Sequence, residues 1–320
     1  MARRALGAAG LAVLQAVQAA HDRDDLMVAC SGGADSLALA LAARVLAERA
    51  GCRVRAVVVD HGLQPGSAAH SAQVAERLGT LGLPAQVVAV SVQPTGEGPE
   101  AAAREARYRA LDDALAPGER CYLGHTLDDQ AETVLLGLAR GSGLRSLAGM
   151  PVARDSFVRP LLGLRRAITR QSCLEQNLTW WDDPHNAESR FSRVRVRGAV
   201  LPVLESELGP GVAEALARTA DLARDDADAL DALALNALAA SREESGRLSV
   251  TGVSGLPAAL RHRVLRLWLR AHGAGELTRA HVLAVAALVT DWHGQKWVEV
   301  PGLRVRRSEG ELRAVQHPAD

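Results

Sequence analysis

Short apolar runs alternate with helical segments along the first two-thirds of the chain, and this alternation constrains the fold more than any other feature. Strands and helices that alternate at such spacing form a parallel sheet with right-handed crossovers. The sequence therefore predicts an α/β, Rossmann-like domain whose ligands bind at the carboxyl ends of its strands. The predicted strands cover residues 26–29, 54–59, 85–91, 121–124 and 157–161, and the predicted helices cover 36–50, 67–82, 99–114, 128–140 and 165–177.

The sequence changes character at residues 202–211 (PVLESELGPG), which we interpret as a domain boundary. Beyond it the chain is helical and rich in Ala and Leu, and its last part, residues 296–315, alternates like a small β-hairpin. A length of 320 residues fits two domains at about 150 residues each. We predict a catalytic parallel-sheet domain over residues 1–205 and a smaller, mainly α-helical domain over residues 206–320, with helices at 256–271 and 278–290.

Charge and cysteine usage exclude some kinds of site. The 37 basic and 37 acidic residues cancel, so binding of a nucleic acid would need a local basic patch. Lys296 is the only lysine, so no lysine-dependent phosphate site precedes it. The cysteines lie far apart, which indicates buried thiols in a reducing cytoplasm; they are Cys30, Cys52, Cys121 and Cys173. We expect neither a signal peptide nor a membrane span.

The strongest chemical signal is an SGGADS loop between the first predicted strand and the helix after it. Its glycines allow a tight turn close to an anion, and its N–H groups and the helix N-terminus can bind phosphate. A carboxylate beside phosphates, here Asp35, implies Mg²⁺ or helix capping. The structural alternative is an ordinary strand-to-helix turn with a serine N-cap and Asp35 as a first-turn acid, but the loop taken alone favours phosphate binding. The loop consists of Ser31, Gly32, Gly33, Ala34, Asp35 and Ser36.

Polar residues also follow the second and fourth predicted strands. They are Asp60 and His61 after the second, and Gly124, His125, Asp129 and Glu132 after the fourth. A turn, and a helix cap at Asp128 or Asp129, are the structural alternatives. Asp129 and Glu132 are three residues apart and share a helix face, where paired acids can hold a metal, an ammonium group or a proton. Like charges so close raise one pKa unless a cation lies between them.

Two later segments give weaker signals. Residues 141–150 (GSGLRSLAGM) form a glycine-rich stretch, for which a helix C-cap and loop is the default interpretation. Residues 181–186 (WDDPHN) precede a basic strip, which could contact nucleic-acid phosphates or form an exposed helix edge. The strip consists of Arg190, Arg193, Arg195 and Arg197.

The order of these blocks resembles that of the tRNA(Ile)-lysidine synthases, a family of N-type ATP pyrophosphatases with a PP-loop. The family's SGGxDS, VDHGL, ARexRY, GHxxDDQxET, RGSGLxGLxGM, RPLL and DPxN…R…R patterns match residues 31–36, 59–63, 103–108, 124–133, 140–150, 159–162 and 183–197. The chain departs from these patterns at Gln64, Ser146 and Val194. The match spans most of residues 26–205, and the rest resembles the family's helical substrate-binding domain less distinctively.

The resemblance implies a ligase that acts on cytidine 34 of an isoleucine tRNA with a CAU anticodon. ATP would activate C2 of the base as an adenylate, with release of pyrophosphate, and the ε-amine of lysine would then displace AMP to give lysidine. The implied cofactors are ATP and Mg²⁺, and the implied partners are this tRNA and free L-lysine. We expect a cytoplasmic enzyme with no membrane partner, and a homodimer is one of the oligomeric states left open.

The resemblance also implies a role for each site residue. The SGGADS loop would bind ATP together with Asp60, His61, Gly124 and His125. The catalytic residues would be Asp35, Asp129, Glu132 and Arg197, with Asp35 also a ligand of Mg²⁺. Lysine would be bound by Arg107, Asp129 and Glu132, with Arg107 at its α-carboxylate. The tRNA would be bound by Arg190, Arg193 and Arg195.

Three other functions share parts of this pattern. A tRNA thiolase of the same superfamily usually needs catalytic or cluster-binding cysteines, which isolated cysteines disfavour. An amidotransferase-type nucleotide synthetase would share the loop but not the DDQAET block. A non-catalytic nucleotide sensor would keep the fold, but intact Asp35, Asp129 and Glu132 argue against lost chemistry.

Overall fold

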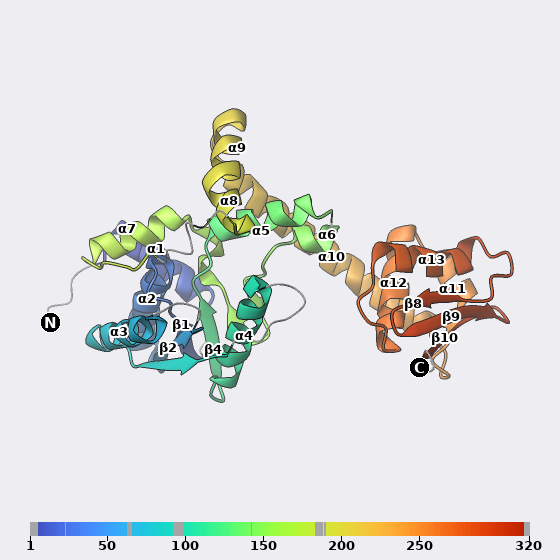
Figure 1. Ribbon diagram of the computed structural model, residues 1–320, viewed down its shortest axis with the longest axis horizontal. Coiled ribbons are helices and arrows are strands. Elements are labelled where there is room, and N and C mark those ends of the chain that lie inside the picture. Colours follow the sequence, from blue (N-terminus) through green and yellow to red (C-terminus); the bar gives the residue numbers. More distant parts are fainter. Residues whose placement is uncertain are drawn as a thin grey trace. The chain divides into compact units, whose positions relative to one another are not determined.

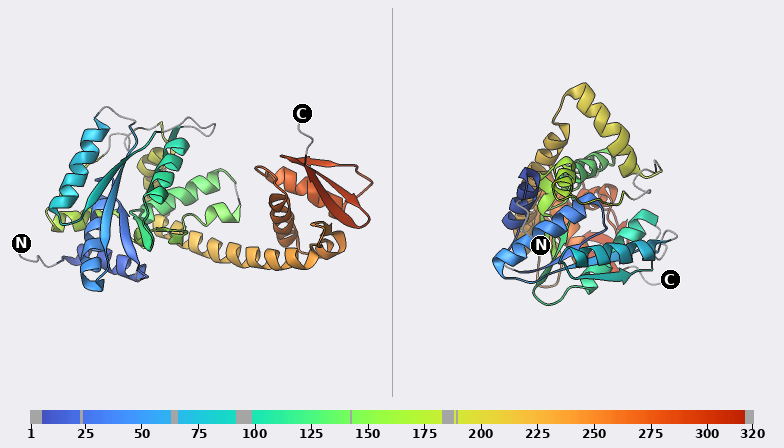
Figure 2. Two further views of the ribbon diagram at one scale, coloured as in Figure 1. Left: turned by 90° about the horizontal axis from the view of Figure 1, so that it is seen from below. Right: turned by 90° about the vertical axis from the view of Figure 1, so that its left-hand side faces the viewer.

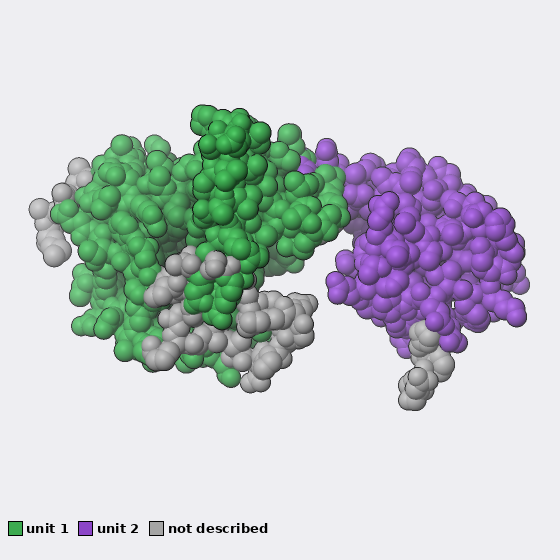
Figure 3. Space-filling model, turned by 45° about the horizontal axis from the view of Figure 1, so that its top comes forward, with its two compact units in different colours: residues 1–222 green, residues 223–320 purple. Residues whose placement is uncertain are grey.

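The chain forms two compact units, residues 1–222 and 223–320, coloured separately in Figure 3. The computed structural model describes residues 6–22, 24–62, 66–91, 99–141, 143–182, 188 and 190–316. The division between the units falls inside the long helix α10 (Val212–Ser241). The predicted domain boundary after residue 205 falls inside the preceding helix, α9 (Leu201–Leu208). None of the described helices is long and apolar enough to cross a membrane.

The first unit is built on a six-stranded sheet with the strand order β3-β2-β1-β4-β6-β5 (Figures 1 and 2). Neighbouring strands are parallel except for the pair β5–β6, which confirms the predicted parallel sheet. The fifth predicted strand is shorter than expected because Pro160 begins a 3₁₀ turn, η1 (Pro160–Gly163). The strands are β1 (Asp25–Ala29), β2 (Val54–Asp60), β3 (Ala85–Ala89), β4 (Glu119–Leu123), β5 (Ala153–Arg154) and β6 (Phe157–Val158).

Both faces of this sheet are buried, which explains why its strands are continuous apolar runs. Leu26 and Val28 of β1 pack in one core, and Met27 packs with Leu111 in a second core on the other face. The first core is completed by α1 (Ala8–Ala19), α2 (Ala34–Ala50), α3 (Ser67–Thr80) and α7 (Arg166–Glu175), and the second by α4 (Pro99–Asp113).

Helix α5 (Leu127–Ala139) follows β4 and is fixed by the glycine-rich segment after it. The Gln130 amide donates to the carbonyl of Met150 (2.9 Å) and accepts from its N–H (2.8 Å). A Cβ on Gly149, whose φ is +56°, would lie only 2.6 Å from the Gln130 oxygen. A Cβ on Gly137 would lie 2.8 Å from Ser146 O in helix α6 (Leu144–Leu147). The segment therefore holds α5 in position by close packing; its Ser142 lies outside the described residues.

The second unit combines helices with a four-stranded antiparallel sheet of order β7-β10-β9-β8. The predicted small hairpin was incomplete, because the end of the chain forms two consecutive hairpins and β7 adds a fourth strand. Gly302 (φ +81°) lies in one turn, and Glu309 and Gly310 (φ +55° and +79°) form the other. The elements are α11 (Val250–Ser254), α12 (Ala258–Ala271), α13 (Arg279–Thr290), β7 (Leu248–Ser249), β8 (Val298–Val300), β9 (Leu303–Ser308) and β10 (Glu311–Gln316).

Candidate active site

The SGGADS loop connects β1 to α2 and is held by its own hydroxyl groups. Ser36 Oγ donates to Gly33 O (2.9 Å) and accepts from Ser31 N (3.2 Å). Gly32 has a φ of +85°, and a Cβ there would lie 2.6 Å from Val74 Cγ2. The N-cap of α2 is Gly33, so the alternative of a serine N-cap is wrong. The loop therefore leaves the positive end of the α2 dipole beside two serines.

The end of β4 approaches this loop closely. A Cβ on Gly124 would lie 3.1 Å from the backbone of Asp35 and of Ser36, so glycine allows the two segments to come together. The carboxyl ends of β1, β2 and β4 are neighbours because these strands are adjacent in the sheet. The residues predicted to bind ATP therefore come from adjoining strand ends, as the sequence indicated.

A single arginine joins the phosphate loop to helix α5. Arg166, the first residue of α7, donates from Nη2 to Asp129 Oδ1 (2.6 Å) and from Nε to Asp35 Oδ2 (3.3 Å). Its Nη1 lies 3.6 Å from Glu132 Oε1. Arg197 donates from Nε and Nη2 to the two oxygens of Glu132, at 2.7 and 3.1 Å. We call these five residues the carboxylate network.

The carboxylate network contains the cations that two close acids require. Arg197 also lies 3.3 Å from Asp129, so each guanidinium contacts both Asp129 and Glu132. Burial is the largest single effect on Asp129 and opposes its charge, but the attraction of Arg166 and the hydrogen bonds from Thr126 are among several effects that together lower the pKa of Asp129. Burial raises the pKa of Asp35, against the opposing effects of Thr169 and Arg166. Three carboxylates face two guanidinium groups, which leaves room for one further cation.

Asp129 serves the network and the helix start together. Its Oδ2 accepts from the N–H and the hydroxyl of Thr126, both at 2.8 Å, while its Oδ1 faces the arginines. The structural alternative placed the helix N-cap at Asp128 or Asp129. This was wrong, because the N-cap of α5 is Thr126. Asp128 instead accepts from the backbone N–H of Arg166 at 2.7 Å, which fixes the start of α7.

A cavity of about 260 Å³ opens beside the network and has walls of both charges. Glu132 is fully buried behind it, and Arg197 reaches it from a π-helical turn, η3 (Val196–Val200). Such turns are rare and often occur at functional sites. Walls that carry both carboxylate and guanidinium groups fit a zwitterion such as a free amino acid. The cavity is lined by Asp128, Glu132, Arg165, Arg166, Arg197, Leu201, Pro202, Glu205 and Ala213.

A second group of polar side chains has nitrogens without partners. Among the described residues, His61 Nδ1, His125 Nδ1 and Arg107 Nε are buried and make no hydrogen bond. Burial lowers the pKa of His125 to about 3, and burial followed by the charge of Arg107 lowers the pKa of His61. Both imidazoles are therefore neutral near pH 7, and unpartnered buried polar atoms point to a missing ligand. Asp60 closes a turn by accepting from Gly62 N (3.0 Å).

The predicted basic strip divides into two parts. Arg197 turns into the carboxylate network, whereas Arg190 and Arg195 are exposed near helix α8 (Ser192–Arg195). Arg190 contacts Glu188 (2.6 Å) and stacks on Phe191. Burial lowers the pKa of Arg107, and the nearby charge of Arg193 acts in the same direction. The remainder of this motif, Asp183, Pro184, His185 and Asn186, lies outside the described residues.

Sequence reasoning missed two residues of the site. Arg166 and Thr169 lie on α7, and the hydroxyl of Thr169 donates to Asp35 Oδ1. The available signal was the RPLLGLRR segment, which places adjacent arginines at the start of a helix after the fifth strand. Those arginines were not recognised, because a charged residue in a first helical turn is usually a solvated one.

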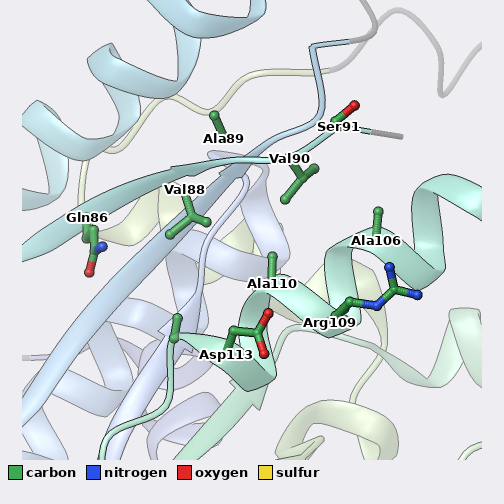
Figure 4. A pocket seen from close by; sticks show the side chains of 10 residues that line it. Gln86, Val88, Ala89, Val90, Ser91, Ala106, Arg109, Ala110 and Asp113 are labelled. Atoms are coloured by element: carbon green, nitrogen blue, oxygen red, sulfur yellow. The ribbon is translucent and has the colours of Figure 1, made fainter. Parts of the chain in front are cut away.

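A second hollow lies away from the site, between β3 and α4 (Figure 4). It has a volume of about 370 Å³, and Figure 4 shows Val88 and Val90 on the strand side with Ala106 and Ala110 on the helix side. Arg109 and Asp113 are its charged lining residues. None of the predicted site residues lines it, so we assign it no part in the chemistry.

The cysteines are free and unreactive. Burial raises the pKa of Cys121 to about 12 and of Cys173 to about 11, so neither is a thiolate near pH 7. Burial also raises the pKa of Cys30, which precedes the phosphate loop. Sulfur transfer through these thiols is therefore disfavoured, in agreement with the sequence analysis.

A phosphate loop after β1, with polar side chains at the ends of β2 and β4, defines a PP-loop nucleotide-binding protein. The family model of the PP-loop domain matches residues 11–204, and that of the TilS substrate binding domain matches residues 248–313. The chain is 54% identical over 294 residues to the tRNA(Ile)-lysidine synthase of Leifsonia xyli, covering 90% of this chain and 88% of that one. The chain belongs to the tRNA(Ile)-lysidine synthase family.

Two further comparisons agree. The tRNA(Ile)-lysidine synthase of Streptomyces coelicolor is 51% identical over 293 residues, covering 89% of this chain and 83% of that one. Among solved structures, the U34-tRNA thiolase NcsA from Methanococcus maripaludis is similar with a TM-score of 0.50 and 15% identity, covering 67% of this chain and 79% of that one. At such low identity the thiolase supports the fold alone.

Proposed function

We propose that the chain is an ATP-dependent ligase that joins L-lysine to C2 of cytidine 34 in an isoleucine tRNA with a CAU anticodon. The products are lysidine, AMP and diphosphate. The observation that carries the proposal is the carboxylate network, in which Arg166 links Asp35 of the phosphate loop to Asp129 and Glu132. A reaction that first adenylates a base and then adds an amine needs an ATP site next to an ammonium site. The Leifsonia xyli and Streptomyces coelicolor relatives bear the name of this activity.

The first step requires a stabilised leaving group. The C2 oxygen of cytidine attacks the α-phosphorus of ATP, and the bond from that phosphorus to the bridging oxygen breaks to release diphosphate. We assign the loop N–H groups, the α2 N-terminus and the hydroxyls of Ser31 and Ser36 to the diphosphate. These groups would donate to the charge that grows as the bond breaks, and the Ser36 hydroxyl would turn away from Gly33 O to do so.

Asp35 is the carboxylate that we assign to Mg²⁺. No group of three or more His, Cys, Asp or Glu side chains among the described residues could hold a metal ion. One carboxylate is nevertheless sufficient, because Mg²⁺ in nucleotide sites is bound largely by phosphates. When bound, Mg²⁺ would neutralise phosphate charge. Thr169 and Arg166 of α7 hold Asp35 and would fix the position of its carboxylate.

The second step uses the negative charge that remains in the network. We assign the ε-ammonium of lysine to Asp129 and Glu132, the two network carboxylates that are not assigned to Mg²⁺. Asp129 or Glu132 accepts a proton from that ammonium, and the amine then attacks C2. The bond between C2 and its oxygen breaks, and AMP leaves with the oxygen. Arg197 holds Glu132 for this transfer and offsets negative charge near the adenylate.

The α-carboxylate of lysine needs a cation outside the network. We assign Arg107 to it, and the unpartnered Nε of Arg107 supports the assignment. The cavity beside the network is lined by Arg165 and not by Arg107, so Arg165 is the rival. Lysine KM separates the two: Arg107→Ala should raise it by about tenfold or more, since a charge-assisted hydrogen bond is lost, and Arg165→Ala should not.

The remaining assignments follow the same geometry. Asp60, His61, Gly124 and His125 would flank the nucleotide at the strand ends, and neutral imidazoles can donate to its ring or ribose. Arg190, Arg193 and Arg195 would contact tRNA phosphates. We assign catalysis to residues 1–205 and further tRNA contacts to residues 206–320, in the cytoplasm. A homodimer would be detected by light scattering.

The deciding experiment follows radiolabelled lysine. The protein is incubated with ATP, Mg²⁺, labelled lysine and an isoleucine tRNA transcript bearing CAU, beside a C34→U transcript. We expect label in the CAU transcript alone, with AMP and diphosphate formed in equal amounts. Diphosphate without label would support the phosphate loop and overturn the lysine site. Folded protein that binds ATP and produces neither would indicate a nucleotide sensor.

A further inference from the structure

Two tryptophans of the second unit are exposed although the chain has few aromatic residues. It contains five Trp, two Tyr and two Phe in 320 residues. Trp292 and Trp297 are 45% and 44% exposed, and both lie in the segment between α13 and β8. Trp268 of α12, by contrast, is fully buried and donates to Gly246 O (2.9 Å). Large aromatic rings contribute most when they are buried. Two that remain exposed in one segment therefore indicate a surface that binds a partner.

Each exposed ring is paired with an arginine of β9. The Arg307 guanidinium lies 4.9 Å from the centre of the Trp292 ring, and that of Arg306 lies 5.3 Å from the centre of the Trp297 ring. Arg307 is fixed by donating to the carbonyl of Leu288 (3.1 Å), near the end of α13. A guanidinium on one face of an indole leaves the other face for a second planar group.

The register of β8 and β9 directs one of these pairs away from the core. Val298 is opposite Val305, so the preceding Trp297 lies across from Arg306. Val305 is buried in the core of the unit, and side chains alternate along a strand, so Arg306 points to the other face of the sheet. The Trp297–Arg306 pair therefore lies on the outer face.

The charge near these pairs is positive. Glu299 is bound by Arg304 (3.0 Å), so this nearby acid already has a partner. Arg306 has no ion pair with any described residue, and its Nε makes no hydrogen bond. Lys296, the only lysine, is exposed in the same segment. Stacking faces combined with unpaired cations suit a polyanion with planar bases better than a protein surface.

We propose that a Trp–Arg surface, consisting of Lys296, Trp297 and Arg306, binds unpaired nucleotides of the tRNA. The inference rests on the proposed function, because it takes the tRNA substrate as the ligand. A base stacks on the free indole face of Trp297, and Arg306 and Lys296 contact the adjoining phosphates. This surface lies within the residues that match the substrate binding domain, and it gives that domain a defined contact area.

The test measures the affinity of the whole enzyme for the CAU transcript. Trp297→Ala should weaken binding on the order of tenfold, since one base stack is lost. Trp297→Phe should restore most of it, and Trp297→Leu, which keeps apolar area without an aromatic face, should not. KM for tRNA should rise with the Kd while kcat stays within about twofold. Quenching of tryptophan fluorescence by tRNA should fall in Trp297→Phe although binding persists.

Arg270→Ala is the matched control, because it removes an exposed arginine of α12 in the same unit. Wild-type lysidine formation tests the proposed function separately from this surface. Active wild type with unchanged tRNA affinity in Trp297→Ala would overturn the surface alone. If Trp297→Ala and Arg270→Ala weakened tRNA binding equally, the loss would come from general charge or folding, and the proposed surface would be overturned. A change in oligomeric state with unchanged tRNA affinity would assign the surface to self-association instead.

Discussion

Arginine is used in opposite ways in the two units. In the first, Arg166 and Arg197 are held by carboxylates at distances down to 2.6 Å, and Glu132 behind them is fully buried. In the second, Arg306 and Arg307 stack on tryptophan rings in solvent. The first arrangement fixes charge inside the protein, and the second presents it outward.

The difference shows why net charge says little about this chain. The formal charge is zero, yet one region keeps a carboxylate in excess and another carries unpaired cations. Buried pairs carry a desolvation cost that their mutual attraction barely offsets, so their retention suggests a role other than stability. Stacked surface cations contribute about 0.5–1 kcal/mol each, so the importance of the second region lies in what it binds.

The largest expected effect is at Glu132, and it tests whether the buried charge of the first unit is chemical. Glu132→Gln keeps the shape but removes the charge that Arg197 holds, so lysine transfer should slow by about 10²–10⁴-fold. Single-turnover formation of lysidine, with adenylate measured in parallel, checks this. Asp129→Asn should act in the same direction.

Glu105→Gln supplies the control, since Glu105 is an exposed carboxylate of α4 that pairs with Arg109. Its rate should match that of wild type. Lysine transfer at the normal rate in both Glu132→Gln and Asp129→Asn would contradict the lysine site and leave the network a structural feature.

Arg166→Gln should cause the largest loss of stability. Arg166 is 16% exposed and contacts three carboxylates, and removing one partner of a buried pair costs about 3–5 kcal/mol. Adding Glu132→Gln restores the charge balance, so the double variant should recover about 1–3 kcal/mol relative to the sum of the single changes. Urea denaturation of the four proteins measures the coupling, and additive losses would show that the network is not a unit.

The strand ends of the first unit were predictable, because an apolar run followed by glycines and acids is typical of a buried strand that ends at a ligand site. The loop at residues 31–36 and the acids Asp129 and Glu132 lie where parallel-sheet geometry puts them. Arg166 was not predictable, because its partners are far away in sequence and only the fold brings α7 against α2 and α5. The sequence therefore predicted that a cation lies between the acids, but not which residue supplies it.

The end of the chain was predicted less well for a different reason. Pro301 and Gly302 interrupt the alternating pattern of residues 296–315, so two hairpins were predicted as one. The Trp297–Arg306 pair depends on the register of β8 and β9, which the single predicted hairpin did not give, because the two residues meet only when these strands are aligned. A sequence pattern indicated the residue types but not their partners.

His125 tests the buried side of the comparison through pH. Its pKa falls from the ordinary 6.5 to about 3 on folding, mainly by burial. Between these values the unfolded chain binds a proton that the folded chain does not, so stability falls as pH falls through this window. From pH 7 to pH 5 the contribution is a loss of up to about 2 kcal/mol. His125→Asn should lose correspondingly less stability between the two pH values, as measured by urea denaturation.

The smallest effect separates the two uses of arginine most directly. If Arg306 contacts a phosphate, Arg306→Ala should reduce the slope of log affinity for tRNA against log salt by about one. Arg166 is neutralised inside the protein, so Arg166→Gln, where it folds, should leave that slope as it was. Fluorescence titrations of tRNA at several salt concentrations give both values. Equal slopes in all three proteins would mean that Arg306 contacts no phosphate and only stabilises the protein. The arginines of the two units would then differ in exposure alone.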